Sequence, residues 1–237
     1  MNAKFALAVF VVILVLSGML MPTLSTPREH TDMINRREKL RKIVAAIHDY
    51  ETEHGHFPLA AWGAGNQLSW RIVLLPHLGE QSLYDQINKT VGWDHPDNIK
   101  YHDQMPSVFQ DPTMNCGSAS SFVALSGAGT AWPTMGNSVG FSDVLDGSSN
   151  TICLITHLGN EANWMQPPLH QFPTFFQRNT GNKRIDSSCA FLDGHVSEVE
   201  LPEPIGEFGS SFLIADWSVS RDNNTMHTER RSPGVSQ

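Results

Sequence analysis

The chain has 237 residues, of which 40% are hydrophobic and 17% charged, so it can build a packed core, and these proportions argue against global disorder. Its net charge of −8 argues against a nucleic-acid-binding or anionic-lipid-binding surface, because both need clustered Lys and Arg. The cysteines Cys116, Cys153 and Cys189 lie far apart without a CxxC pair, which argues against a structural zinc site of the usual spacing. Their odd number leaves the disulfide state open.

The first 25 residues contain a continuous apolar segment. Residues 5–21 carry no charge, and a helix of this length spans about 26 Å, close to the ~30 Å of a hydrocarbon core. Lys4 and the amino terminus favour a cytoplasmic N-terminus. We expect residues 1–25 to be a single transmembrane anchor in the inner (cytoplasmic) membrane, with residues 5–21 in lipid and the rest periplasmic or extracytoplasmic. A signal peptide cleaved after small residues is the alternative.

An amphipathic helix is expected from about residue 27 to residue 54. The segment TPRE at residues 26–29 fits a capping box with proline at the first helical position. Apolar residues then recur at three- and four-residue spacing, which predicts one apolar stripe. They are Met33, Ile34, Leu40, Ile43, Val44, Ile47 and Tyr50. Gly55 and Pro58 are typical of a helix end.

Beyond Pro58, glycine and proline separate short apolar runs. A short helix is expected within 68–78, and strands are expected at 121–125, 151–156, 189–192 and 195–201. Asp193-Gly194 joins the last two strands as a hairpin turn. The segment 218–237 is polar and unpatterned, which predicts a disordered tail after an ectodomain of residues 26–217.

Several short motifs follow one another in a specific order. They are LRKI and AIHDY within 40–50, HGHFP at 54–58, LSWR at 68–71, LLP at 74–76, LYDQ at 83–86, WDHPDN at 93–98, MPSVF at 105–109, DGSSNTI at 146–152 and DGHV at 193–196. Together they resemble a bacterial pilin-like family of unknown function that is abundant in planctomycetes. Members of that family begin with a prepilin-type helix and often end in an H-x9-DG element.

The resemblance implies an α+β, pilin-like fold, in which a long N-terminal helix packs on an antiparallel β-sheet with long loops. It also implies an envelope-anchored relative of pseudopilins whose partners belong to secretion or pilus-like systems. In the alignment that it suggests, Met1 falls at the mature pilin start, Phe5 replaces the membrane-buried glutamate, and Lys183 replaces the histidine of H-x9-DG. We therefore expect a plain anchor more than a filament core.

One loop has oxygen ligands at a spacing that suits calcium. Asp143, Asp146, Ser148 and Asn150 lie within eight residues, and calcium takes six to eight oxygen ligands. Pseudopilins that carry calcium near their C-terminal sheet add to this hypothesis through the resemblance. The alternative is a turn in which Ser148 and Asn150 bond to their own backbone, and it is favoured because no bidentate glutamate follows.

Two further groups of side chains are candidate binding sites. His48, His54 and His56 with Glu51 and Glu53 enrich the expected helix end, which is either a transition-metal site or, more simply, a polar terminus that complements the helix dipole. The tryptophans Trp62, Trp93, Trp132 and Trp164 lie in loop-like segments. They either stack on sugars of the envelope or fill a core under the loops.

The sequence offers little for catalysis. It contains no GxSxG nucleophile elbow, no GxGxxG and no P-loop. We therefore expect no enzyme activity and no cofactor other than calcium. The predicted function is a membrane-anchored structural or protein-interaction module, with an envelope glycan- or calcium-binding module as the alternative.

Overall fold

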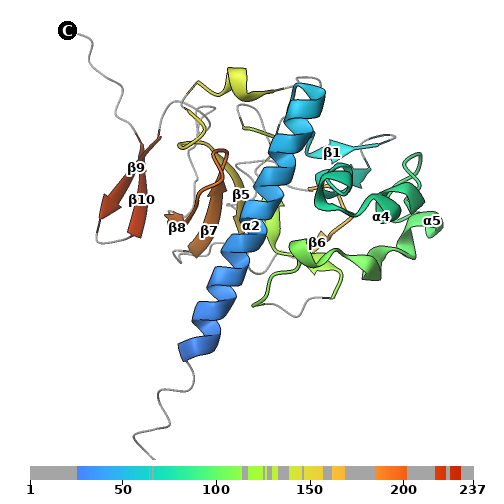
Figure 1. The fold of residues 1–237 in the computed structure, drawn as a ribbon, viewed down its shortest axis with the longest axis horizontal. Helices are drawn as coiled ribbons and strands as arrows, with labels where there is room; N and C mark the ends of the chain where they lie inside the picture. The colour runs from blue at the N-terminus through green and yellow to red at the C-terminus, as the bar shows by residue number, and fades with distance from the viewer. Residues whose placement is uncertain are drawn as a thin grey trace, which may run out of the picture.

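The structure is a computed structural model of the chain. It describes residues 26–63, 65, 67–113, 117–124, 126, 130–132, 139–145, 147–156, 162–168, 185–201, 217–222 and 225–230. The fold is mixed α+β, with the helix α2 (Thr26–His54) between a six-stranded sheet and a group of short helices (Figure 1).

The helix α2 is 29 residues long and corresponds to the helix expected from about residue 27 to residue 54. Its apolar stripe is buried from Leu40 onward, through Ile43, Ile47 and Tyr50. The helix ends at His54 and is followed by Gly55. The φ of Gly55 is 76°, which is easily reached only by glycine, and its amide donates to the Glu51 carbonyl at 2.7 Å. Packing of this stripe holds the C-terminal half of α2 against the rest of the fold.

The main sheet has the strand order β4-β5-β7-β8-β10-β9. Its strands are β4 (Phe122–Ala124), β5 (Ile152–Thr156), β7 (Ile185–Phe191), β8 (Val196–Leu201), β9 (Trp217–Asp222) and β10 (Thr225–Arg230). The pairing between β8 and β10 is parallel, and the other pairs are antiparallel. The helix α2 contacts β7 and β8 of this sheet.

The hairpin expected around Asp193-Gly194 is confirmed. The strands β7 and β8 pair in register from Ile185↔Leu201 to Ala190↔Val196. Gly194 has a φ of 90°, and the Asp193 carboxylate accepts the His195 amide at 3.0 Å. The turn chemistry that the DG dipeptide supplies therefore sets this register.

Short elements fill the chain between α2 and the sheet. They are β1 (Ala61–Trp62), β2 (Leu68–Ser69), α3 (Trp70–Val73), η3 (Pro76–Leu78), α4 (Gln81–Gln86), α5 (Pro96–Ile99), η4 (His102–Gln104), η5 (Ser107–Phe109), β3 (Ala119–Ser120), η6 (Phe141–Asp143) and β6 (Ala162–Asn163). The short helix expected within 68–78 is thus divided into a strand and two helices. Ser69 begins α3 by accepting the Arg71 amide at 3.3 Å, and Pro76 begins η3.

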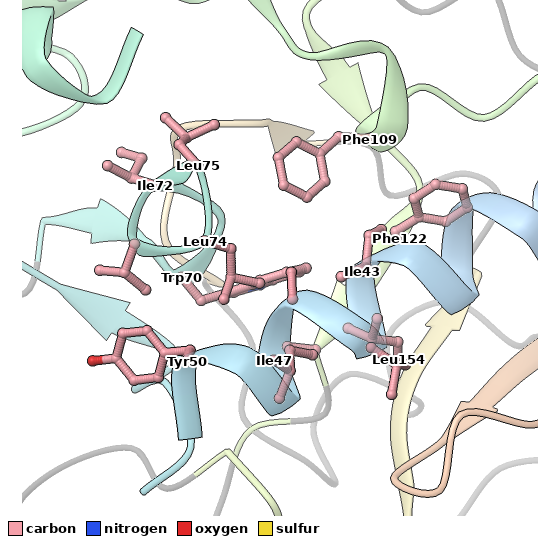
Figure 2. Close-up of a cluster of buried hydrophobic side chains, with 14 of the residues drawn as sticks. Ile43, Ile47, Tyr50, Trp70, Ile72, Leu74, Leu75, Phe109, Phe122 and Leu154 are labelled. Carbon is pink, nitrogen blue, oxygen red and sulfur yellow. The ribbon is translucent and has the colours of Figure 1, made fainter. Parts of the chain in front are cut away.

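The core lies where α2 meets these short helices and the sheet (Figure 2). Figure 2 labels its residues Ile43, Ile47, Tyr50, Trp70, Ile72, Leu74, Leu75, Phe109, Phe122 and Leu154. The Trp70 and Phe109 rings meet edge to face, with centroids 6.0 Å apart. Because each such side chain contributes about 1.5–3 kcal/mol when buried, this cluster is the main stabilising feature of the fold.

The C-terminal segment differs from the expectation of a disordered tail. Residues that were expected to lie in that tail form most of β9 and all of β10, which pair in register from Thr225↔Asp222 to Arg230↔Trp217. The strand β10 also joins the edge of β8 through Met226↔Val199 and His227↔Glu200. These mostly polar strands at one end of the sheet carry little hydrophobic pattern, so the sequence alone did not reveal them.

The expected membrane anchor, residues 1–25, lies outside the described residues. In the part of the chain that the structure does describe, none of the helices has both the length and the apolar character that a membrane crossing needs.

Candidate functional site

A cavity of about 270 Å³ opens beside the C-terminal end of α2. It lies between α2, β1, α3, η3 and α4. Its lining residues are Tyr50, Glu53, His54, Trp62, Val73, Pro76, His77, Gln81 and Tyr84. We call it the helix-end pocket. Histidine, carboxylate and phenol groups line one small volume there, and convergent polar groups in a pocket are one feature of binding sites.

The last turn of α2 sets the position of His54. Tyr50 and His54 are four residues apart, so they share a helix face, and their rings stack with centroids 4.0 Å apart and planes at 10°. His54 Nδ1 lies 2.9 Å from the Tyr50 carbonyl oxygen. A carbonyl can only accept, so Nδ1 carries the proton and donates, and in the neutral ring Nε2 keeps its lone pair.

His77 reaches the pocket from η3. Pro76 begins this short helix, and Gly79 ends it with a φ of 81° and an amide that donates to the Pro76 carbonyl at 3.2 Å. The His77 side chain is only 13% exposed, and its Nε2 lies 3.7 Å from a Glu53 carboxylate oxygen. The Glu53 side chain is 68% exposed. A largely buried imidazole therefore faces a largely exposed carboxylate.

Three potential metal ligands meet at this point. Glu53, His54 and His77 each offer one atom, and these atoms all lie within 4.8 Å of one another. Two imidazole nitrogens and one carboxylate oxygen can hold a proton between them or bind a transition metal. Among the residues that the structure describes, this is the one group of three His, Cys, Asp or Glu side chains whose possible ligand atoms lie this close together.

Two tyrosines border the same pocket. Burial raises the pKa of Tyr50, and Tyr84 and Glu53 raise it further. Burial also raises the pKa of Tyr84, with a smaller effect from Asp85. Both side chains are therefore neutral phenols at neutral pH, able to donate and accept hydrogen bonds at the pocket wall.

The structure divides the expected histidine-rich helix end. His48 Nε2 lies 2.5 Å from the Leu192 carbonyl oxygen, and Glu51 accepts the Phe141 amide at 3.3 Å, so both serve contacts elsewhere. Of that group, Glu53 and His54 lie close to His77 and form the three-residue cluster with it. His77 was missed because it lies in a short apolar segment, and only tertiary packing brings it to α2.

Two of the four candidate tryptophans fit the alternative of a core under the loops. Trp132 and Trp164 are fully buried. Their indole nitrogens donate to the carbonyls of Cys153 at 2.6 Å and His102 at 3.0 Å. Neither ring can stack on a ligand at the surface. The two others are partly buried: Trp62 borders the helix-end pocket, while Trp93 stacks on His102 with centroids 5.4 Å apart.

The expected calcium ligands lie around η6 and the turn before β5. Asp143 caps η6 by accepting the Gly140 amide at 2.9 Å. The Ser148 carbonyl accepts the Asp193 amide at 3.2 Å, and the Asn150 amide donates to the Gly147 carbonyl at 3.1 Å. Asp146 lies outside the described residues. The turn contacts fit the simpler interpretation of this loop, and calcium binding stays a prediction.

The cysteines offer no reactive thiol in the described part of the chain. Cys153 and Cys189 are fully buried in β5 and β7. Burial raises the pKa of both thiols, so they stay protonated and unreactive at neutral pH. Cys116 lies outside the described residues.

Comparison with known proteins gives one match. Residues 36–138 match the model of a family described as a protein of unknown function, DUF1559. This segment includes every residue that lines the helix-end pocket. Neither the curated proteins nor the solved structures contain a match to this chain.

Proposed function

We propose that this chain is an extracytoplasmic, pilin-like module that is anchored in a membrane and acts through protein contacts, not through catalysis. Three observations support the proposal. The sequence has an uncharged apolar segment at residues 5–21, the fold is α+β with a long helix against a largely antiparallel sheet, and residues 36–138 are similar to DUF1559. The motif order of the pilin-like family adds the analogy with pseudopilins.

The course of α2 is the observation that carries the proposal. Its C-terminal half is buried through Leu40, Ile43 and Ile47, whereas its N-terminal part extends past the sheet (Figure 1). Met33 is 37% and Ile34 48% exposed on that part. A helix of this kind can lead from a membrane segment into the domain and leave apolar side chains for a protein partner.

Fractionation tests the anchor. The full-length chain should remain in the membrane fraction after a high-salt wash and be released by detergent, whereas a variant without residues 5–21 should be soluble. N-terminal sequencing of the recovered protein distinguishes a retained anchor from a cleaved signal peptide. Recovery of the unaltered chain in the soluble periplasm without detergent would contradict the proposal.

A glycan-binding role is the second candidate, and Trp62 is the residue that favours it. Its ring borders the helix-end pocket together with Tyr84, at a centroid distance of 6.4 Å. Aromatic faces of this kind can hold a sugar ring. Trp62→Ala should abolish retention on envelope glycan, while Trp93→Ala, at a partly exposed tryptophan outside the pocket, should not. Equal retention of both variants, or none by the native chain, removes this candidate.

The calcium version of the binding role depends on Asp143 and its neighbours. It predicts a higher melting temperature of the full-length chain in millimolar calcium, and loss of this shift in Asp143→Asn. An unchanged melting temperature counts against it.

A further inference from the structure

We propose that Glu53, His54 and His77 form a binding site for a divalent transition-metal ion of the zinc type. This inference goes beyond the proposed anchoring function and does not depend on it. It rests on the chemistry and spacing of the donor atoms, on the exposure of each side chain, and on the position of the group at the C-terminal end of α2.

The spacing of the donors is close to that of a metal site. Their atoms lie within 4.8 Å of one another. In a tetrahedral site with bonds of about 2.0–2.1 Å, ligand atoms lie roughly 3.4 Å apart. Glu53 can supply its own share of the contraction, because its side chain is 68% exposed and is free to change rotamer.

His54 makes a hydrogen bond of the kind that metal-binding histidines make. Its Nδ1 donates to the Tyr50 carbonyl at 2.9 Å, so Nε2 is the nitrogen available for a metal. Metal-binding histidines use the second nitrogen in this way, since a hydrogen bond to a carbonyl or carboxylate fixes the ring and its tautomer. Stacking on Tyr50, with planes at 10°, further restricts the ring.

The position at the C-terminal end of α2 favours a cation. The last carbonyl groups of a helix carry partial negative charge, and Glu53 adds a full negative charge beside them. His77, which is only 13% exposed, presents the second imidazole from η3 at 3.7 Å from Glu53. The site is therefore partly formed before an ion binds.

The donor set selects the class of metal. Calcium and magnesium prefer oxygen ligands, whereas two imidazoles and one carboxylate suit zinc and similar ions. Three protein ligands leave one position for water or for a group from a partner. A bound ion would join the end of α2 to η3, two elements that already contact each other.

Titration of the purified full-length chain with zinc tests this proposal. The native chain should bind one zinc ion and melt at a higher temperature when zinc is present. His77→Ala and Glu53→Gln should each weaken binding at least about tenfold, because loss even of a supporting group typically costs 10–100-fold. His30→Ala is the matched control, since His30 lies exposed at the other end of α2 and should bind zinc like the native chain.

Cobalt(II) supplies a readout that a merely structural role would not change. The native chain should show visible d–d absorption when it binds cobalt, and His77→Ala should lose that band while His30→Ala keeps it. Glu53→Gln changes an exposed side chain, so it remains informative even if His77→Ala fails to fold. Equal zinc affinity in Glu53→Gln and His30→Ala, or no cobalt band in the native chain, overturns the site.

Discussion

Asp111 is a buried carboxylate that joins α2 to the loop after η5. One oxygen accepts from the Arg36 guanidinium at 3.2 Å and from Thr113, and the other accepts the Ser121 hydroxyl at 2.7 Å. Burial acts to raise the pKa of Asp111, but these hydrogen bonds and the charge of Arg36 outweigh it and hold the pKa below its usual value. The ionised form is therefore the form that stabilises the fold.

Replacing this carboxylate should be costly. Asp111→Ala should lower the free energy of unfolding by about 3–5 kcal/mol at neutral pH, because it leaves the largely buried Arg36 side chain without its counter-charge. Asp103→Ala, at an exposed position on η4, is the control and should change it by less than about 0.5 kcal/mol. Urea unfolding measures both values.

The same carboxylate predicts a pH dependence. Its folded-state pKa is lowered, so its contribution is fully present above the unfolded value of 3.8 and is lost as the pH falls through the folded value. The difference in stability between the native chain and Asp111→Ala should thus shrink below about pH 3.8. A difference that stays constant down to pH 2 contradicts the assigned hydrogen bonds.

Arg71 is a buried cation at the base of the core. It donates to the Ser69 hydroxyl at 3.0 Å and to the Phe122 carbonyl, and its guanidinium lies 4.6 Å from the centre of the Trp70 ring. Burial lowers its pKa to about 9, so it is still charged at neutral pH. The planar guanidinium group of Arg71 therefore links α3 to β4 inside the fold.

Lysine should not replace this arginine. Arg71→Lys should lower the free energy of unfolding by about 2 kcal/mol, because an ammonium group cannot reproduce the fork or stack on Trp70. Arg41→Lys provides the same change at an exposed site, where the side chain is 52% exposed, and should be near neutral. Equal losses in the two variants would show that the buried contacts contribute nothing.

At the scale of elements, the same isoleucine-to-alanine substitution can be made at a buried position and at an exposed position of α2. Ile47→Ala removes a fully buried side chain and should cost about 2–5 kcal/mol in unfolding free energy. Ile34→Ala removes the same atoms from a side chain that is 48% exposed, and its cost should stay below about 0.5 kcal/mol. A similar cost for both would mean that the N-terminal part of α2 is covered in the isolated chain.

The elements that could be predicted from the sequence are those with local signals. The apolar spacing from Leu40 to Tyr50 predicts α2, and Asp193-Gly194 predicts the β7–β8 hairpin. The strands β9 and β10 were missed because their backbone pairing with each other and with β8 needs no hydrophobic alternation.

The candidate site could be predicted only in part, for a different reason. Glu53 and His54 are adjacent in the sequence, but His77 reaches them through the packing of η3 on α2. The tryptophans Trp132 and Trp164 looked like loop residues because glycine and proline surround them. Their burial follows from tertiary packing, which no local pattern encodes.

For the whole molecule, the proposed arrangement is an anchor at residues 1–25, a helix that leads away from the membrane, and a domain whose far end holds the helix-end pocket. The pocket lies at the C-terminal end of α2, and the anchor precedes its N-terminal end. If the anchor is retained, the length of α2 can separate the proposed metal site from the membrane by up to about 40 Å, at 1.5 Å per residue.

Labelling of intact spheroplasts with a membrane-impermeant maleimide tests the orientation of this domain most directly. Leu145→Cys places a thiol at a side chain that is 87% exposed, while Cys153 and Cys189 are fully buried, and Cys116→Ser removes the remaining native thiol. We predict that the chain with both Leu145→Cys and Cys116→Ser is labelled in the membrane before lysis. The control chain, which carries Cys116→Ser alone, should not be labelled. Labelling only after the spheroplasts are lysed would place the domain in the cytoplasm and contradict the proposed function.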